Sequence, residues 1–247
     1  MMLTKIKKNM KYFKFIFLLV TGLFISCEDD STLGVSKVTT YPNITVTGDA
    51  LVLIATGSSY TDAGAIALAG ETEITPEVTT SSGVYHGNAF STANPDKYVV
   101  TYSAENSDGF SGSALREVWV ATTGDLTTSI EGLYSMSTER VGRTTNTGNY
   151  VLITKTGANT YELTHGVGGW YSIGLGYGPG YAARGGIITA NDIATNDFSV
   201  SNAQFPIWGN VVEITDFMVD AGTKTVTYTG TGDWGAVFKA TLTQVQL

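Results

Sequence analysis

Apolar and polar residues alternate in short runs along most of the chain, and glycine, asparagine, aspartate or proline separates the runs. In residues 96–105, Tyr98, Val100 and Tyr102 fall on one face and smaller or polar residues fall on the other. A period of two over a run of this length is typical of a half-buried β-strand. The pattern therefore predicts strands, with no helix longer than a single turn.

Residues 43–121 contain about seven such segments, which fits a β-sandwich. Pro76 interrupts one of them. We expect this segment at a sheet edge or a bend, because proline has no backbone N–H to donate to a strand ladder. Trp119 alternates with Val118 and Val120, and we interpret it as structural packing. The clearest predicted strands are 43–47, 50–55, 72–80, 96–105 and 116–121.

Residues 130–247 form a second unit, joined to the first by a polar link at 122–129. About eight strands in this unit fit a closed or nearly closed antiparallel β-barrel, or a second sandwich. The predicted strand segments are 149–157, 160–166, 170–178, 185–192, 197–203, 210–220, 224–232 and 236–245. The expected fold class is thus all-β, an N-terminal immunoglobulin-like β-sandwich followed by a C-terminal antiparallel β-barrel or sandwich.

The first 26 residues are typical of a cleaved secretory signal. Five lysines precede an apolar run at 15–25, and Ser26 follows it. A membrane-spanning helix needs roughly 20 apolar residues, so this run is too short for the alternative of a transmembrane anchor.

Cys27 follows the signal directly and is the only cysteine of the chain. The sequence "FISC" resembles a bacterial lipobox, which implies that Cys27 is acylated and becomes the mature N-terminus. The acids at 28–30 resemble an export signal for the outer face of the outer membrane; a solvated linker, with the protein held on the periplasmic face, is the alternative. Residues 27–42 are polar and read as a tether.

Three segments of the first unit resemble the bacterial immunoglobulin-like module of crystal toxins and surface lipoproteins. These are "YTDAGAIAL" (60–68), "PDKYVVTYSAENSDGFSG" (95–112) and "REVWV" (116–120). The resemblance implies a spacer domain. The "EGLY" sequence at 131–134 loosely resembles the start of a calycin-like barrel, and the two-unit arrangement resembles lipoproteins of unknown function from glycan-utilisation gene clusters.

The charge of the chain disfavours nucleic acid as a partner. Removing residues 1–26 takes away five lysines and changes the formal charge from −8 to −13, and an acidic surface repels phosphate backbones. The two histidines, His86 and His165, are interpreted as solvated or locally bonded side chains. With Cys27 lipidated, no cluster of metal ligands is expected, and no cofactor is implied.

Motifs for catalysis are weak, and we expect a protein that is not an enzyme. No Gly-x-Ser-x-Gly elbow occurs. The glycine-rich run at 174–186 contains a Gly-x-Gly-x-x-Ala match, but its flanks read as strands and no helix follows, as a dinucleotide site would require. Acids are plentiful in the second unit, so a glycoside hydrolase with paired carboxylates stays as the less favoured alternative.

Aromatic residues in and beside the glycine-rich run supply the best candidate site. Sugar C–H faces pack on aromatic rings, glycine lets a loop approach a ligand closely, and arginine offers a fork of hydrogen-bond donors. We therefore expect a glycan-binding or glycan-capture accessory lipoprotein whose partners are the membrane, a polysaccharide or oligosaccharide, and other envelope lipoproteins. A calycin-like small-ligand binder or an adhesion or assembly module is the alternative. The predicted ligand-binding residues are Trp170, Tyr171, Tyr177, Tyr181, Arg184, Trp208 and Trp234.

Overall fold

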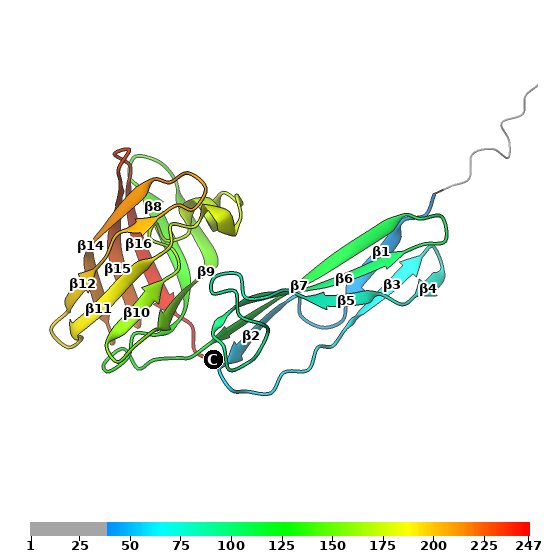
Figure 1. Ribbon diagram of the computed structural model, residues 1–247, viewed down its shortest axis with the longest axis horizontal. Helices are drawn as coiled ribbons and strands as arrows, with labels where there is room; N and C mark the ends of the chain where they lie inside the picture. Colours follow the sequence, from blue (N-terminus) through cyan, green and yellow to red (C-terminus); the bar gives the residue numbers. More distant parts are fainter. Residues whose placement is uncertain (1–38) are drawn as a thin grey trace, which may run out of the picture. The chain divides into compact units, whose positions relative to one another are not determined.

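The computed structural model describes residues 39–247 (Figure 1). The predicted signal peptide, the lipidation site Cys27 and most of the predicted tether lie outside the described residues. Within the described range, no helix has both the length and the apolar character needed to span a membrane. The described chain is an all-β protein, as the alternation of its residues predicts.

The first domain is a sandwich of a four-stranded and a three-stranded sheet. The smaller sheet has the order β1-β3-β4, and the larger has the order β2-β7-β6-β5, in which β2 and β7 are parallel. The strands are β1 (Pro42–Val46), β2 (Leu51–Ala55), β3 (Ala65–Ala69), β4 (Thr72–Ile74), β5 (Glu77–Thr80), β6 (Asp96–Glu105) and β7 (Ser111–Ala121). The predicted strand at 72–80 is split at Pro76, and its halves β4 and β5 lie at the edges of different sheets.

The sandwich core contains the residues that the alternation selects. Tyr98 and Tyr102 in β6 are fully buried, as are Val118 and Val120 in β7. Trp119 points to the other face of β7, where it is 2% exposed. Its burial agrees with a packing role, because successive side chains of a strand lie on opposite faces.

A charged network is built into this sandwich around Arg116, which is 2% exposed. Its guanidinium pairs with Asp62 and donates to the backbone carbonyl oxygens of Thr47 and Asp49. The hydroxyls of Tyr60 and Tyr102 donate to Asp62 at 2.9 and 2.8 Å. The network ties β7 to the segment that precedes β3, so a buried cation is matched by a carboxylate and by backbone acceptors.

The second domain is a single nine-stranded antiparallel sheet that curls into a half-barrel (Figure 1). The strand order is β12-β11-β10-β9-β8-β16-β15-β14-β13. The strands are β8 (Gly132–Arg140), β9 (Thr145–Lys155), β10 (Thr160–Leu163), β11 (Gly186–Asp192), β12 (Asp197–Val200), β13 (Ala203–Gln204), β14 (Val211–Asp220), β15 (Thr225–Gly232) and β16 (Val237–Gln244). Of the two predicted architectures, the curled sheet is the barrel-like one rather than a second sandwich.

The segment 170–178 is the main error of the sequence prediction. It is not a strand: a single-turn π-helix, η1 (Trp170–Gly174), is followed by a loop and the short 3₁₀ turn η2 (Pro179–Tyr181). Gly168 and Gly169 precede η1 with φ of 55° and 75°. Glycine adopts these left-handed conformations without a steric penalty, so the chain turns inward and places Trp170 in the core.

Tyr228 of β15 holds the chain just before η1. Its hydroxyl donates to the carbonyl oxygen of His165 at 2.5 Å and accepts from the backbone N–H of Gly168 at 3.0 Å. Gly230, also in β15, has no room for a side chain, because a Cβ there would collide with the carbonyl oxygen of Gly166. The strand therefore fixes where the loop containing η1 and η2 begins.

Candidate functional site

The candidate site contains three of the predicted aromatic residues, Tyr177, Tyr181 and Trp208. The centroid of the Tyr181 ring lies 4.8 Å from that of Trp208 and 5.5 Å from that of Tyr177. The centroids of Tyr177 and Trp208 are 6.2 Å apart. Tyr177 and Trp208 are 50% and 41% exposed. The three rings line a surface hollow of about 300 Å³, which we call the aromatic hollow.

The rings do not form the flat platform that a sugar-binding surface suggests. Trp208 lies at 86° to Tyr177 and 59° to Tyr181, and the two tyrosines lie at 73° to each other. The three rings are therefore not coplanar. The rings instead pack against one another, edge to face or tilted, and together they line a shallow hollow at the surface.

The local backbone conformation determines where these rings lie. Gly178, with φ of 90°, begins the η2 turn that carries Tyr181. Trp208 lies in the β13–β14 loop, which Gly209 closes by donating its N–H to the carbonyl oxygen of Phe205 at 2.8 Å. The ring of Phe205 lies 5.2 Å from Trp208. Glycine-rich loops and the underlying ring of Phe205 thus bring the three rings together, although they lie up to 31 positions apart in the sequence.

Two predicted ligand residues are core residues instead. Trp170 is 4% exposed and Tyr171 is 9% exposed. Trp170 packs against Phe238 at 5.9 Å, and Tyr171 meets Trp208 edge to face at 5.0 Å and 85°. Neither offers a free ring face, but Tyr171 supports Trp208 from inside the domain.

The other two predicted residues lie away from the hollow. Trp234 is 37% exposed and lines a separate groove with Arg140 and Arg143. Arg184 places its guanidinium 5.1 Å from the Tyr85 ring and donates to the carbonyl oxygen of Pro179 at 3.0 Å. The arginine therefore braces the η2 turn and does not line the aromatic hollow.

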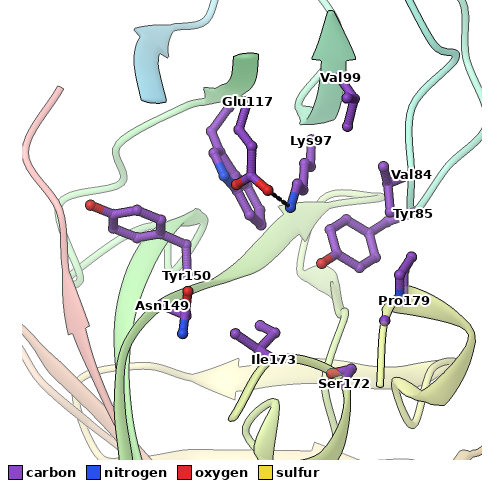
Figure 2. A pocket seen from close by; sticks show the side chains of 12 residues that line it. Val84, Tyr85, Lys97, Val99, Glu117, Asn149, Tyr150, Ser172, Ile173 and Pro179 are labelled. Carbon is purple, nitrogen blue, oxygen red and sulfur yellow. Dashed lines mark hydrogen bonds and ion pairs between the residues drawn. The ribbon is translucent and has the colours of Figure 1, made fainter. Parts of the chain in front are cut away.

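Sequence reasoning missed a second pocket, which the two domains line together (Figure 2). This interdomain pocket has a volume of about 300 Å³. The sandwich contributes Val84, Tyr85, Lys97, Val99, Glu117 and Trp119, and the half-barrel contributes Asn149, Tyr150, Ser172, Ile173, Gly178 and Pro179. No local pattern could reveal it, because the two sets of residues come together only in the folded chain.

The contact between the domains is packed as well as polar. Trp119 and Ala121 of the sandwich form a buried cluster with Leu133 and Leu152 of the half-barrel, all 2% exposed or less. The Tyr85 hydroxyl lies 3.4 Å from Nε2 of His165. The pocket is therefore bordered by a close-packed apolar contact rather than by a loose gap.

Both histidines lie at this contact. Burial, together with the nearby cations of Arg184 and Lys97, lowers the pKa of His165 to about 3, so its ring is neutral. His165 is fully buried and bonds Thr164 at 2.7 Å, so the prediction of a locally bonded histidine is confirmed and that of a solvated one is wrong. The adjacent carboxylates of Asp96 and Glu162 raise the pKa of His86 to about 9 despite partial burial.

Neither the aromatic hollow nor the interdomain pocket is lined by a pair of carboxylates. Glu117 is the acidic residue of the interdomain pocket, and it pairs with Lys97 at 2.5 Å. In residues 39–247, no three His, Cys, Asp or Glu side chains are grouped to hold a metal ion. The "ENSDG" segment at 105–109 is a hairpin turn, in which Asn106 Oδ1 accepts from the N–H groups of Asp108 and Phe110.

Comparison with known proteins finds a matching family model in each domain. Residues 44–120 match the family of bacterial surface protein Ig-like domains, and residues 123–244 match a family described as a C-terminal domain. No curated protein matches the chain significantly. The crystal structure of the lipoprotein BT2262 from Bacteroides thetaiotaomicron superposes with a TM-score of 0.63 and 23% identity, over 82% of this chain and 100% of that one. This similarity extends across both domains and establishes the shared fold.

Proposed function

We propose, from the premise that this chain carries a bacterial surface Ig-like domain followed by a half-barrel domain, that it is a lipid-anchored, non-catalytic protein that captures glycans at the cell envelope. The sandwich would act as the spacer, the Cys27 acyl chains would hold the protein at the outer membrane, and the half-barrel would bind the ligand.

The observation that carries the proposal is the aromatic hollow. A protein does not gain stability by leaving Tyr177 and Trp208 half-exposed beside each other, and contiguous exposed apolar surface marks an interaction site. Tyr177, Tyr181 and Trp208 line the hollow, and each tyrosine carries a hydroxyl as well as a ring. Sugars present the complementary chemistry, because they combine apolar C–H faces with hydroxyl groups.

The interior of the half-barrel argues against a calycin-like binder. Trp170, Tyr171 and Phe238 belong to one buried cluster within the domain, and their rings pack edge to face or tilted at 4.8 to 5.9 Å. Calycin-like binding would need these rings to line an open interior. Their close packing favours ligand capture at the surface loops.

An assembly role is a second candidate, supported by exposed aliphatic residues that lie close in sequence to the residues of the hollow. Ile207 is 58% exposed and Leu175 is 41% exposed. A Cβ on Gly180 would contact Ile207, so Ile207 lies against the η2 turn. Another envelope lipoprotein could dock on this apolar surface.

A glycan array probed with the purified protein tests the proposal and separates the two candidates. We expect binding to one family of oligosaccharides, with strong loss in Trp208→Ala and in Tyr181→Ala. Phe110→Ala, a half-exposed ring of the sandwich, is the matched control and should bind like the wild type. The assembly role would be favoured instead by two results together. The array would show no binding, and an envelope lipoprotein would copurify with the wild type but not with Trp208→Ala.

A further inference from the structure

The interdomain pocket contains two buried polar groups that have no partner in the protein. Trp119 is 2% exposed and Ser172 is 6% exposed, and both line the pocket. Neither the indole N–H of Trp119 nor the hydroxyl of Ser172 has a hydrogen-bond partner. An unsatisfied buried polar group costs about 1–3 kcal/mol, so each one calls for an explanation.

The walls of the pocket combine rings with a neutralised charge pair. Figure 2 shows Lys97 and Glu117 on one side, Ser172 and Ile173 on the opposite side, and Tyr150 and Tyr85 between them. Lys97 Nζ lies 5.4 Å from the centroid of the Trp119 ring and 2.5 Å from Glu117 Oε1. The pocket therefore offers apolar ring surface, hydrogen-bond donors and an acceptor, with no net charge among its lining side chains.

This chemistry selects the ligand. A purely apolar ligand would leave the Trp119 and Ser172 groups unpaired. An anionic ligand would have to separate Lys97 from Glu117 and face the freed carboxylate. A hydroxyl group both donates and accepts, so a neutral polyhydroxylated ring can pair with all of these groups and stack on the aromatic walls.

We propose that the interdomain pocket is a binding site for a single neutral pyranose ring, with Trp119 and Ser172 donating hydrogen bonds to it. Its volume of about 300 Å³ lies at the lower end of the range for ligand pockets, which suits one ring rather than an oligomer. The site is separate from the aromatic hollow: Gly178 and Pro179 line the pocket, whereas Tyr177 and Tyr181 on either side line the hollow.

Indole N–H signals test the proposal directly. The chain has four tryptophans, so a ¹⁵N-labelled sample gives an indole signal for each, and Trp119→Phe identifies the one from Trp119. D-glucose, D-galactose, D-mannose and N-acetyl-D-glucosamine are titrated separately, with sodium glucuronate as the charged comparison. We expect at least one neutral sugar to shift the Trp119 signal saturably, and glucuronate to bind more weakly.

Ser172→Ala tests the second donor with little risk to the fold, because its hydroxyl bonds nothing in the protein. Loss of one hydrogen bond should weaken sugar binding by about three- to tenfold, whereas the exposed control Ser199→Ala should not change it. The proposal is overturned if no neutral sugar shifts the Trp119 signal saturably, if Ser172→Ala binds unchanged, or if glucuronate binds most tightly. Trp208→Ala should leave the Trp119 shift intact, so failure here is distinct from failure of the aromatic hollow.

Discussion

Nε2 of His86 in the sandwich lies 3.6 Å from Oε2 of Glu162 in the half-barrel, and Nδ1 of the same ring lies 3.3 Å from Oδ2 of Asp96. The backbone N–H groups of Tyr85, His86 and Lys97 also donate to Asp96. Burial alone would raise the pKa of Asp96, but these donors and His86 hold it below its usual range. A protonated histidine therefore bridges carboxylates from the two domains.

The His86 bridge predicts a loss of stability as the solution becomes alkaline. The folded-state pKa of about 9 exceeds the ordinary 6.5, so the contribution is complete below about pH 6.5 and disappears as pH rises through about 9. Solvent reaches part of the pair, so we expect His86→Asn to lower the free energy of unfolding by only about 1–2 kcal/mol at about pH 6. Urea unfolding across this pH range should show the gap closing; a gap that widens with pH would contradict the assignment.

The Asp62–Arg116 pair predicts a large and local stability effect. Burial opposes the charge of Asp62, but hydrogen bonds from Tyr102 and Tyr60, with the Arg116 cation, hold its pKa below the usual range. Asp62→Ala leaves the buried Arg116 without its carboxylate, and we expect a cost of about 2–4 kcal/mol. Glu73→Gln, in the exposed edge strand β4, is the control and should change unfolding by less than about 0.5 kcal/mol. Equal effects of the two variants in chemical denaturation would refute the network's role.

Gly230 predicts how tightly the half-barrel holds the loop that contains η1 and η2. Ala at this position collides with the backbone of Gly166, which cannot move as a side chain can. We expect Gly230→Ala to lower stability by about 1–3 kcal/mol and to shift the indole signal of Trp170 in η1. Gly222→Ala, which would meet only the flexible side chain of Asp220, should be nearly neutral. An unperturbed Trp170 signal in Gly230→Ala would show that β15 does not position the loop.

Strand periodicity made much of this fold predictable. The alternation around Tyr98 and Val118 selects buried residues because a strand places every second side chain on the same face. The same reasoning failed at 170–178, where consecutive apolar residues resemble a buried strand. Two left-handed glycines turn that segment into η1 instead, and a composition of apolar residues does not reveal a turn that depends on neighbouring strands.

The candidate site was less predictable than the fold. The sequence marks Tyr177, Tyr181 and Trp208 as aromatic residues near glycines, but it marks Trp170 in the same way. Only the packing of the folded chain determines which ring is exposed and which is buried, since the same local sequence is compatible with either. Trp119 illustrates the converse, because its expected packing role is compatible with lining a pocket that requires both domains.

Lipid anchoring is testable without reference to the folded domains. Cys27→Ser should abolish acylation, because the modified atom is the cysteine sulfur. Each acyl CH₂ contributes about 0.8 kcal/mol to membrane binding, so we expect the variant to leave the detergent phase in a detergent-partitioning experiment and to remain unprocessed. Wild type treated with globomycin should behave alike. Unchanged partitioning of Cys27→Ser would exclude the proposed anchor.

Calorimetric titration of the best oligosaccharide from the array tests the central claim, that the aromatic hollow captures glycans. The wild type should bind with measurable affinity. Trp208→Ala should weaken binding by at least about tenfold, corresponding to about 1.4 kcal/mol, while its circular dichroism and unfolding stay close to those of Phe110→Ala. Wild-type affinity in folded Trp208→Ala and Tyr181→Ala would contradict the account.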